Sequence, residues 1–350
     1  MTKNKFALVT GSCGLIGFEA SRFFISQGFT VIGIDNDMRS FFFGKEGSTD
    51  KQKAALRQDY PDSYIHYSID IRNEKKIHHI FKKYPIDLII HTAAQPSHDW
   101  AATRPEIDFS INTQATLFLL EAMRAHAPKS VFIFTSTNKV YGDNPNRLSF
   151  TQQKLRYELK KTDENYQGIT ETMSIDNTLH SLFGVSKCAA DLLVQEYGKY
   201  FGLSTGVFRC GCLTGPRHAA AKQHGFLAYL IKCINHDIPY TIYGYKGKQV
   251  RDILHAYDLV TAFFEFYKAP TKGDVYNMGG GRSVNVSMKE AIIKIEKMTT
   301  KKINISYDPI PRKGDHVWYI SNTSKFERKY PLWKRHYTID QILSEEIQSL

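Results

Sequence analysis

A glycine-rich turn near the N-terminus constrains the fold of this chain more than any other feature. The apolar stretch at 6–10 ends at GSCGLIG, and a helical pattern follows directly. Glycines in this place let the backbone turn sharply and approach a diphosphate, while the helix N-terminus offers free N–H groups and the positive end of its dipole. We therefore expect a dinucleotide site formed by Gly11, Gly14, Leu15, Ile16 and Gly17.

An acidic residue after the next strand supports this interpretation. The strand expected at 30–34 ends at Asp35 and Asn36, about twenty residues beyond the turn. An acid there hydrogen-bonds the ribose hydroxyls of NAD and repels the 2′-phosphate of NADP, so NAD is the expected cofactor. Arg39 lies nearby and would suit that phosphate, which leaves NADP as the alternative. For the glycines alone, the alternative is an ordinary tight turn.

Strands and helices alternate through the first part of the chain. Beyond the first strand–helix–strand unit, we expect strands at 64–68, 87–91, 130–135 and 204–208, and helices at 74–83, 108–126 and 183–201. This alternation is typical of an α/β fold, a Rossmann-type doubly wound parallel sheet. Residues 144–178 are polar and weakly periodic, so a loop with some local structure is expected there.

The elements become shorter after Gly215. Helices are expected at 225–235, 256–267 and 287–298, with strands at 241–243 and 275–278. We predict an NAD-binding domain at 1–215 and a smaller C-terminal lobe at 216–350 that mainly binds substrate, with the chain crossing between the two.

Further cofactor contacts are expected where the third, fourth and fifth strands end. Ligands of an open α/β sheet sit at the carboxyl ends of its strands, so these residues should face one crevice. They are Asp70, Ile71, Ala93, Ala94, Gln95 and Thr135. For Asp70, the competing interpretation is a cap at the start of the next helix.

Composition argues against several other classes of protein. The formal net charge is +11, but the lysines are scattered and form no basic run, so nucleic acid is not an expected partner and RNA binding is a remote alternative. The five cysteines lack disulfide-framework or zinc-site spacing, which favours reduced thiols and no metal. No signal peptide and no membrane-spanning stretch is expected, which indicates a cytoplasmic protein.

Together these motifs resemble the extended short-chain dehydrogenase/reductase family, and best its sugar-nucleotide epimerases and dehydratases. The resemblance covers nearly the whole chain, on GSCGLIG with Asp35, HTAAQ at 91–95, TSTNKVYG at 135–142, Lys187 and GPR at 215–217. Within the family, STNKVYGD, KQVRD at 248–252 and GGGRSVNVSM at 279–288 most resemble the CDP-paratose 2-epimerases.

The resemblance implies an NAD-dependent epimerase of a nucleotide-activated hexose or deoxyhexose, with a sugar-nucleotide dehydratase as an alternative. In such epimerases the nicotinamide takes a hydride from a sugar carbon, C2 in a 2-epimerase, and returns it to the other face of the keto-sugar. The resemblance also implies a role in polysaccharide biosynthesis. It implies a homodimer in which the helices at 108–126 and 183–201 pair across a four-helix bundle.

The family carries out its proton chemistry with a Ser or Thr, a Tyr and a Lys, and this chain lacks the tyrosine. Thr137 takes the first place and would hydrogen-bond the reacting hydroxyl, while Lys187 would hold the nicotinamide ribose. The Tyr position falls on Phe183, which cannot exchange a proton. This departure favours another alternative, a protein that binds a nucleotide sugar or NAD(H) without turnover.

His98 and Asp99 are the candidate replacements for the tyrosine. They follow the fourth strand, where the family's loop faces the sugar, and a histidine can act as a base near neutral pH. Tyr141 and His180 are further candidates. The competing interpretation is that His98 hydrogen-bonds within its loop and that Asp99 caps the next helix.

Substrate contacts are expected from the C-terminal part of the chain. Arg251, with Gln249 in the same stretch, matches a family position that grips the diphosphate, a task that suits a planar guanidinium. Arg312 and Asp315 match the family's phosphate- and ribose-binding pair, and His224 lies where related chains cover the nucleotide. A surface ion pair is the competing interpretation for each arginine.

Overall fold

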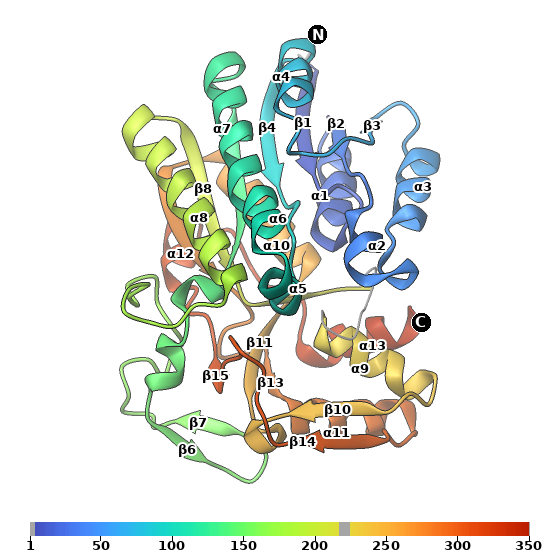
Figure 1. Ribbon diagram of the computed structural model, residues 1–350, viewed down its shortest axis with the longest axis vertical. Helices are drawn as coiled ribbons and strands as arrows, with labels where there is room; N and C mark the ends of the chain where they lie inside the picture. Colours follow the sequence, from blue (N-terminus) through green and yellow to red (C-terminus); the bar gives the residue numbers. More distant parts are fainter. Residues whose placement is uncertain (1–3, 217–224, 350) are drawn as a thin grey trace.

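A parallel sheet of seven strands forms the centre of the computed structural model, which describes residues 4–216 and 225–349 (Figure 1). The strand order is β12-β8-β5-β4-β1-β2-β3, so the direction of winding reverses at β1. The strands are β1 (Lys5–Thr10), β2 (Phe29–Ile34), β3 (Tyr64–Tyr67), β4 (Ile86–His91), β5 (Val131–Thr137), β8 (Ser204–Cys210) and β12 (Lys272–Met278). The expected doubly wound Rossmann fold is confirmed.

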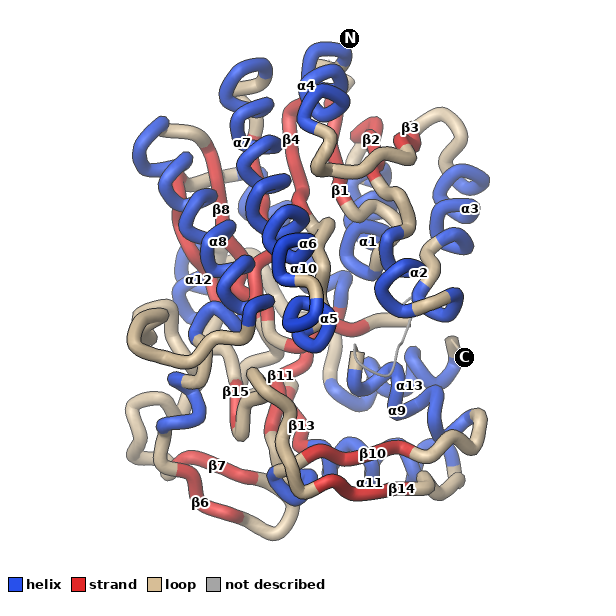
Figure 2. Tube along the Cα trace, in the orientation of Figure 1, coloured by secondary structure: helices blue, strands red, loops and turns tan. Residues whose placement is uncertain are grey.

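Helices cover both faces of this sheet (Figure 2), because its strands are apolar on both sides. In β1, Ala7 and Val9 point to one face and Leu8 to the other, as the two-residue period of a strand requires. The first face carries α1 (Leu15–Ser26), α3 (Asp50–Asp59), α10 (Ala256–Lys268) and α12 (Ser324–Lys329). The second carries α4 (Glu74–Lys83), α7 (Ala115–His126) and α8 (Leu182–Phe201).

A smaller lobe lies beyond the carboxyl ends of these strands, at the bottom of Figure 1. Its four-stranded sheet contains β9 (Cys212–Thr214), β11 (Val250–His255), β13 (Asn285–Ser287) and β15 (Trp318–Tyr319). Two strand pairs flank it, β10 (Tyr240–Tyr243) with β14 (Ile305–Asp308), and β6 (Phe150–Gln152) with β7 (Tyr157–Leu159). Its helices are α9 (Phe226–Asn235), α11 (Met288–Thr299) and α13 (Ile339–Gln348).

The chain crosses between the two lobes more than once. The β6–β7 hairpin precedes residue 215 but hydrogen-bonds the smaller lobe, where the Tyr157 N–H donates to the Lys248 carbonyl at 2.9 Å. The helix α10 and the strand β12 follow residue 215. The helix packs on one face of the large sheet, and the strand is the edge strand of that sheet. The large sheet is therefore completed by residues from the second half of the chain.

The helix expected at 108–126 is longer and irregular. It begins with α6 (Pro105–Phe109) and passes through a π-helical segment, η2 (Ser110–Gln114), before α7. Asn112, in this segment, bonds the backbone of Gln95 in both directions: its Oδ1 accepts from the Gln95 N–H at 2.9 Å and its Nδ2 donates to the Gln95 carbonyl at 3.1 Å. A π turn re-aims a side chain in a way that hydrophobic periodicity does not reveal.

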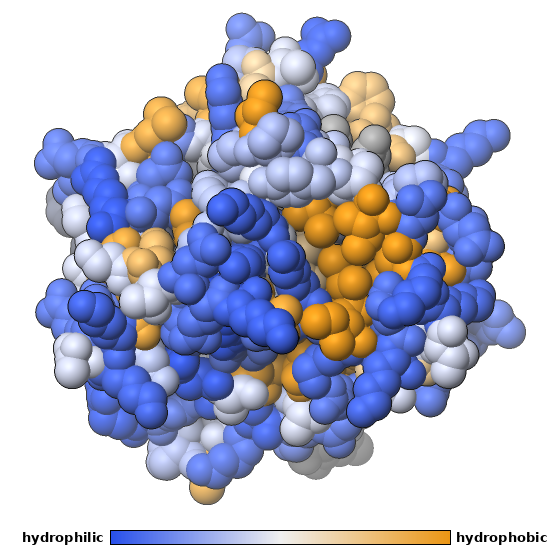
Figure 3. Space-filling model, turned by 90° about the horizontal axis from the view of Figure 1, so that it is seen from below, coloured by the Kyte–Doolittle hydropathy of each residue, from blue (hydrophilic) through white to orange (hydrophobic). Residues whose placement is uncertain are grey.

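Several short elements were not expected from the sequence because they are too brief or too polar to show a period. They include α2 (Met38–Phe43), α5 (His98–Thr103), η1 (Lys45–Gly47), η3 (Asn138–Tyr141), η4 (Asn144–Arg147) and η5 (Tyr245–Gly247), together with α3. Seen from below, the surface is mainly hydrophilic, with an apolar patch towards one side (Figure 3). None of the helices in the described ranges is long and apolar enough to cross a membrane.

Candidate functional site

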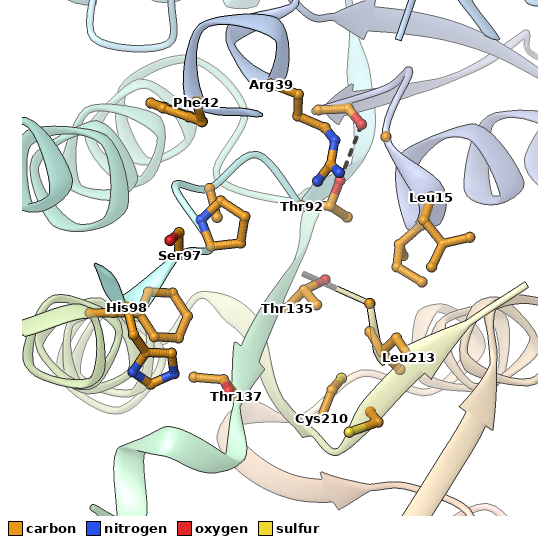
Figure 4. Close-up of a pocket in the computed structure, with 18 of the residues that line it drawn as sticks. Leu15, Arg39, Phe42, Thr92, Ser97, His98, Thr135, Thr137, Cys210 and Leu213 are labelled. Carbon is orange, nitrogen blue, oxygen red and sulfur yellow. Dashed lines mark hydrogen bonds between the residues drawn. The ribbon is translucent and has the colours of Figure 1, made fainter. Parts of the chain in front are cut away.

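A cavity of about 500 Å³ opens at the carboxyl ends of the large sheet, where the smaller lobe faces it (Figure 4). This is the place where open α/β sheets bind ligands. The predicted residues that line it are Gly11, Gly14, Leu15, Ile16, Asp35, Asn36, Arg39, Asp70, Ile71, Ala93, Ala94, His98, Asp99, Thr135, Thr137, Lys187, Gln249, Arg251, Arg312 and Asp315. Gly17 and Gln95 lie outside this lining.

The glycine turn has the backbone geometry that the sequence predicts. Gly11 has a φ of +66°, and a Cβ there would lie 2.8 Å from the backbone nitrogen of Ala93. Gly17 packs beneath the turn, where a Cβ would lie 2.0 Å from the Gly11 carbonyl oxygen. At Gly14, by contrast, a Cβ would lie 3.4 Å from that oxygen, which is an ordinary contact. Gly17 therefore shapes the turn, and Gly14 faces the cavity.

The carboxylate of Asp35 organises the turn from the next strand. Its Oδ2 accepts a hydrogen bond from the Cys13 N–H at 3.0 Å and its Oδ1 accepts from the Asp37 N–H at 2.9 Å. Burial is the largest influence on this carboxyl and raises its pKa. Arg39 reaches into the cavity beside it (Figure 4), with its guanidinium 5.1 Å from the centre of the Phe43 ring. Each carboxylate oxygen keeps a lone pair that fits a ribose hydroxyl.

Asp70 lines the cavity but is engaged by an arginine. Its Oδ2 lies 2.6 Å from Nη2 of Arg72, and its Oδ1 accepts from Nε of Arg72 at 3.0 Å. The helix α4 is capped instead by Asn73, whose side chain accepts from the Lys76 N–H at 3.1 Å. The helix-cap interpretation of Asp70 is therefore wrong.

Gln95 supports the cavity wall from behind. Its side chain is fully buried, and its amide donates to Oδ1 of Asp108 at 2.7 Å and to the Ser97 carbonyl at 2.9 Å. Because the amide is used in this way, Gln95 positions the loop after β4, whereas the neighbouring Ala93 and Ala94 face the cavity.

Lys187 projects from α8 towards the end of β5. Its ammonium donates to the Thr135 carbonyl at 2.8 Å and lies 4.1 Å from the centre of the Phe134 ring. Burial is the main influence on this group and lowers the pKa of Lys187 to about 8. Thr137, at the end of the same strand, accepts from the Lys139 N–H at 3.2 Å through its hydroxyl oxygen. These contacts bring the two predicted family residues onto one wall.

The imidazole of His98 packs against Phe183, in the first turn of α8. The two ring centres are 5.0 Å apart at an angle of 60°. Nδ1 of His98 is buried and has no hydrogen-bond partner in the described structure, and burial, followed by the charge of Lys139, lowers the pKa of His98 to about 3. His98 and Thr137 reach into the same part of the cavity (Figure 4).

The cap interpretation of Asp99 is wrong. The helix α5 is capped by Ser97, whose hydroxyl accepts from the Trp100 N–H at 3.2 Å, so Asp99 is not the cap. His98 forms no hydrogen bond within its loop through Nδ1. Asp99 lines the cavity at an exposed position of the same turn.

The other two candidates for the missing tyrosine point away from the cavity. The hydroxyl of Tyr141 donates to Oδ1 of Asn277 at 2.7 Å, and burial raises the pKa of Tyr141 to about 12. Nε2 of His180 lies 2.8 Å from the Val140 carbonyl. Neither residue belongs to the cavity lining.

The residues expected to bind substrate lie on the opposite side of the cavity. Arg251, from β11, is buried and forms an ion pair with the partly exposed side chain of Asp315. Burial raises the pKa of Asp315, but the charges of Arg251 and Lys139 outweigh it and hold the pKa at about 2. The guanidinium of Arg312 lies 4.4 Å from the centre of the Tyr243 ring. The competing interpretation for Arg251 was an ion pair on the outer surface. The ion pair exists, but it lies in the cavity wall.

One more side chain on this side has an unused polar atom. Oε1 of Gln249 is buried and unpartnered within the described ranges, and Gln249 lines the cavity. Arg217 and His224 lie outside the described residues. No group of three or more His, Cys, Asp or Glu that could hold a metal ion occurs in 4–216 and 225–349.

Sequence reasoning missed Lys139, which also lines the cavity. Its ammonium donates to the Gly314 carbonyl at 2.9 Å, and burial lowers the pKa of Lys139 to about 8. Lys139 stands two residues after Thr137, and only the tight turn of η3 brings it back to the same wall. The signal that could have identified Lys139 was its position within the STNKVYG motif.

Comparison with known proteins agrees with this geometry. The model of the NAD dependent epimerase/dehydratase family matches residues 7–279. The chain is 32% identical to CDP-paratose 2-epimerase of Salmonella typhi over 325 residues, 91% of each chain. It is 27% identical to UDP-glucuronate 4-epimerase of Thermodesulfobacterium geofontis, over 86% of this chain and 83% of that one. It is 26% identical to dTDP-glucose 4,6-dehydratase of Salmonella typhimurium, over 97% and 91%.

Solved structures share the fold. UDP-glucose 4-epimerase from Bifidobacterium longum, in complex with NAD+ and UDP, has a TM-score of 0.81 at 22% identity and covers 99% of this chain and 98% of that one. UDP-glucose 4-epimerase from Thermotoga maritima, with UDP-glucose, has a TM-score of 0.78 at 23% identity and covers 98% of each chain.

Proposed function

The chain belongs to the NAD dependent epimerase/dehydratase family, and from this premise we propose that it epimerises a nucleotide-diphosphate hexose or deoxyhexose. The expected cofactor, NAD, is the cofactor of the family. The observation that carries the proposal is that Thr137, Lys187 and His98 line the same cavity as the glycine turn. The CDP-paratose 2-epimerase relative supports C2 as the reacting carbon and a CDP-sugar as the substrate.

The residues at the carboxyl ends of the strands of the large sheet fit NAD. The turn from Gly11 to Ile16 would hold the diphosphate, with Gly14 leaving room for it, and Asp35 would bind the adenosine ribose. Lys187 would hold the nicotinamide ribose. When bound, NAD supplies a hydride acceptor that takes a hydride from the sugar carbon and later returns it.

We assign the proton chemistry to the residues around Phe183. Thr137 would hydrogen-bond the reacting hydroxyl, and His98 would accept the proton of this hydroxyl and return it when the keto group is reduced. Burial lowers the pKa of His98 to about 3, so its imidazole is uncharged at neutral pH, and the same burial opposes the charged form that accepting a proton creates. Asp99 is the second candidate, but it occupies an exposed position.

The smaller lobe would bind the substrate. Arg251 and Arg312 would hold the diphosphate of the nucleotide sugar, with Asp315 and Gln249 at the sugar and ribose hydroxyls. We assign cofactor binding mainly to residues 1–215 and substrate binding mainly to residues 216–350. Cell-surface polysaccharide biosynthesis in the cytoplasm would be the setting of such an enzyme.

Exposed apolar side chains favour a homodimer. On α8, Leu182, Val185 and Leu192 are 47%, 45% and 44% exposed, and Phe109 at the end of α6 is 47% exposed. Apolar side chains clustered on a helix face typically mark a protein interface. We therefore propose that two copies pair through the helices α7 and α8.

Two alternatives have support of their own. Phe183 favours a protein that binds a nucleotide sugar or NAD(H) without turnover, because the ring cannot exchange a proton. The dTDP-glucose 4,6-dehydratase relatives favour dehydration of a sugar nucleotide.

The deciding experiment is incubation of the purified protein with CDP-, UDP-, GDP- and dTDP-sugars, with the products followed by NMR. One epimerised product without net NADH formation would support the proposal, and the inverted carbon would identify the reaction. A product that has lost water would indicate a dehydratase. Tight binding with no product from any of the nucleotides would support the binding protein.

A further inference from the structure

Lys139 places an unpaired cation beside the candidate proton acceptor. Its side chain is partly buried, lines the cavity, and forms no ion pair with any described residue. The ammonium has three N–H donors, and the structure gives it one acceptor, the Gly314 carbonyl at 2.9 Å. A partly buried charge with unused donors is costly unless a ligand satisfies it.

The residue Gly314 connects this cation to His98. A Cβ at Gly314 would lie 2.8 Å from Nδ1 of His98, so the imidazole packs on one side of this residue while Lys139 holds its carbonyl. The φ of Gly314 is +76°, a backbone conformation that glycine adopts readily. Nδ1 of His98 is thus covered by Gly314, and Lys139 bonds the carbonyl of the same residue, so both side chains line the cavity around Gly314.

Two other charged side chains near Lys139 already have contacts within the protein. Asp315, the carboxylate that acts most strongly on Lys139, is bound to Arg251. Arg312 lies over Tyr243. Lys139 is instead close in the chain to Thr137, the residue expected at the reacting hydroxyl, whose oxygen accepts from the Lys139 N–H. The backbone of Lys139 thus contacts Thr137, while its ammonium lies against the loop of residues 312–315, so this side chain spans the space between the two.

We propose that Lys139 is a catalytic residue whose ammonium hydrogen-bonds the oxygen on the reacting carbon of the sugar, while His98 accepts the proton of that oxygen. This inference rests on the proposed function. The O–H bond of the sugar would break and an N–H bond of the His98 imidazole would form, with the hydride going to NAD when that cofactor is bound. The return of hydride and proton would restore His98, while Lys139 keeps its protons throughout. A fixed cation at this oxygen stabilises the negative charge that develops there.

The test measures how tightly the NAD-loaded, full-length protein binds nucleotides that carry a sugar and nucleotides that lack it. Affinities for CDP and CDP-glucose, and for UDP and UDP-glucose, are measured by calorimetry on the wild type, Lys139→Met and Lys139→Arg. Methionine keeps most of the stem and removes the charge, whereas arginine keeps the charge. The matched control is Lys129→Met, an exposed lysine before the start of β5, at the opposite end of the sheet.

We expect Lys139→Met to weaken the binding of the preferred sugar nucleotide about ten- to a hundredfold and to leave the nucleoside diphosphate unchanged. Lys139→Arg should lose less, and Lys129→Met should lose nothing. Lys139→Gln replaces the methionine variant if thermal melting shows that the latter does not fold.

Three results would contradict these expectations in distinguishable ways. An equal loss for both ligands would mean that Lys139 only holds the loop of residues 312–315, and unchanged affinities would mean that it contacts no sugar. Either result overturns this inference alone. A wild-type protein that binds neither sugar nucleotide would overturn the proposed function as well.

Discussion

At the scale of single residues, we propose that Phe183 stands where the family has its catalytic tyrosine, with the ring kept and the hydroxyl lost. Phe183 occupies the position, and its ring is covered by the imidazole of His98 at 5.0 Å. On this proposal, phenylalanine would remove a proton acceptor, and the titratable side chain of His98 packs against the same ring. Lys187 and Thr137 stay in place around it.

Replacing His98 should abolish most of the proton transfer. We expect His98→Gln to lower kcat about a hundred- to ten-thousandfold with little change in KM, because general base catalysis contributes that much. Adding Phe183→Tyr to this variant should restore part of the rate by returning a phenol beside Lys187. Steady-state kinetics on the substrate identified by NMR would measure both effects. A larger loss in Asp99→Asn than in His98→Gln would transfer the role to Asp99.

The activity should fall in mildly alkaline solution. Burial lowers the pKa of both Lys139 and Lys187 to about 8, so each ammonium loses its proton as the pH rises through that value. Below it both lysines are charged and His98 is neutral, so kcat/KM should form a plateau there. A pH–rate profile would measure this. The alkaline limb should move to higher pH in Lys139→Arg if Lys139 contributes to it.

At the scale of elements, the strand–turn–helix unit of β1 and α1 depends on glycines with different tasks. Gly17 allows α1 to pack on the turn, and Gly14 leaves space on the cavity side. The carboxylate of Asp35 then holds the turn through the Cys13 N–H. Local sequence thus encodes this unit almost completely.

Alanine at these two glycines should separate folding from cofactor binding. In Gly17→Ala the new Cβ would lie 2.0 Å from the Gly11 carbonyl oxygen, so the turn must shift, and both Tm and NAD affinity should fall. Gly14→Ala should leave the Tm of the NAD-free protein nearly unchanged and weaken NAD, since its Cβ meets no backbone closer than 3.4 Å. Thermal melts with and without NAD would test this, and equal Tm losses would contradict it.

The C-terminal helix α13 is attached to β9 by one buried carboxyl. Glu346 accepts hydrogen bonds from the Thr214 hydroxyl and from the Gly215 N–H, the latter at 2.9 Å. Burial is the largest influence and raises the pKa of Glu346 from 4.5 to about 7. The folded state therefore holds this proton after the unfolded state has released it, so the stabilising effect is present at low pH and is lost as the pH rises through about 7.

A glutamine at this position should remove that pH dependence, because its oxygen accepts the same bonds without ionising. We expect Glu346→Gln to match the wild type at about pH 5 and to be more stable at about pH 8, by up to about 3 kcal/mol. Urea unfolding at both pH values would measure the difference. A constant difference between the two proteins would show that Glu346 does not titrate in this range.

At the scale of the whole molecule, the site exists only because two lobes face each other. The large sheet supplies the glycine turn, Thr137 and Lys187, and the smaller lobe supplies Arg251 and the loop of residues 312–315. The chain crosses between the lobes several times, and β12 completes the large sheet at its edge. Neither lobe contains the complete cavity.

Charged residues on the exposed face of α8 should separate the proposed dimer. We expect the double variant Val185→Glu and Leu192→Glu to be monomeric with little change in Tm, because these side chains are 45% and 44% exposed and contribute little to the core of one copy. Light scattering after gel filtration would give the mass. The control Leu332→Glu changes a leucine that is 77% exposed and lies outside this helix. A dimer that persists in the double variant would place the interface elsewhere.

The sequence alone determined the alternation of strands and helices, the glycine turn and the family. Apolar stretches, helical periods and the glycine spacing extend over a few residues and depend on backbone sterics, so they can be read within a short window. Thr137 and Lys187 were found because their motifs are local.

Only the tertiary structure decided which distant groups meet. It directed Gln95 away from the cavity and used Asn112 in a π turn to hold the loop after β4. It also brought Lys139 beside His98 through Gly314, a residue far along the chain. Such meetings depend on how whole elements pack and on which buried polar atoms find partners, and no local pattern records them.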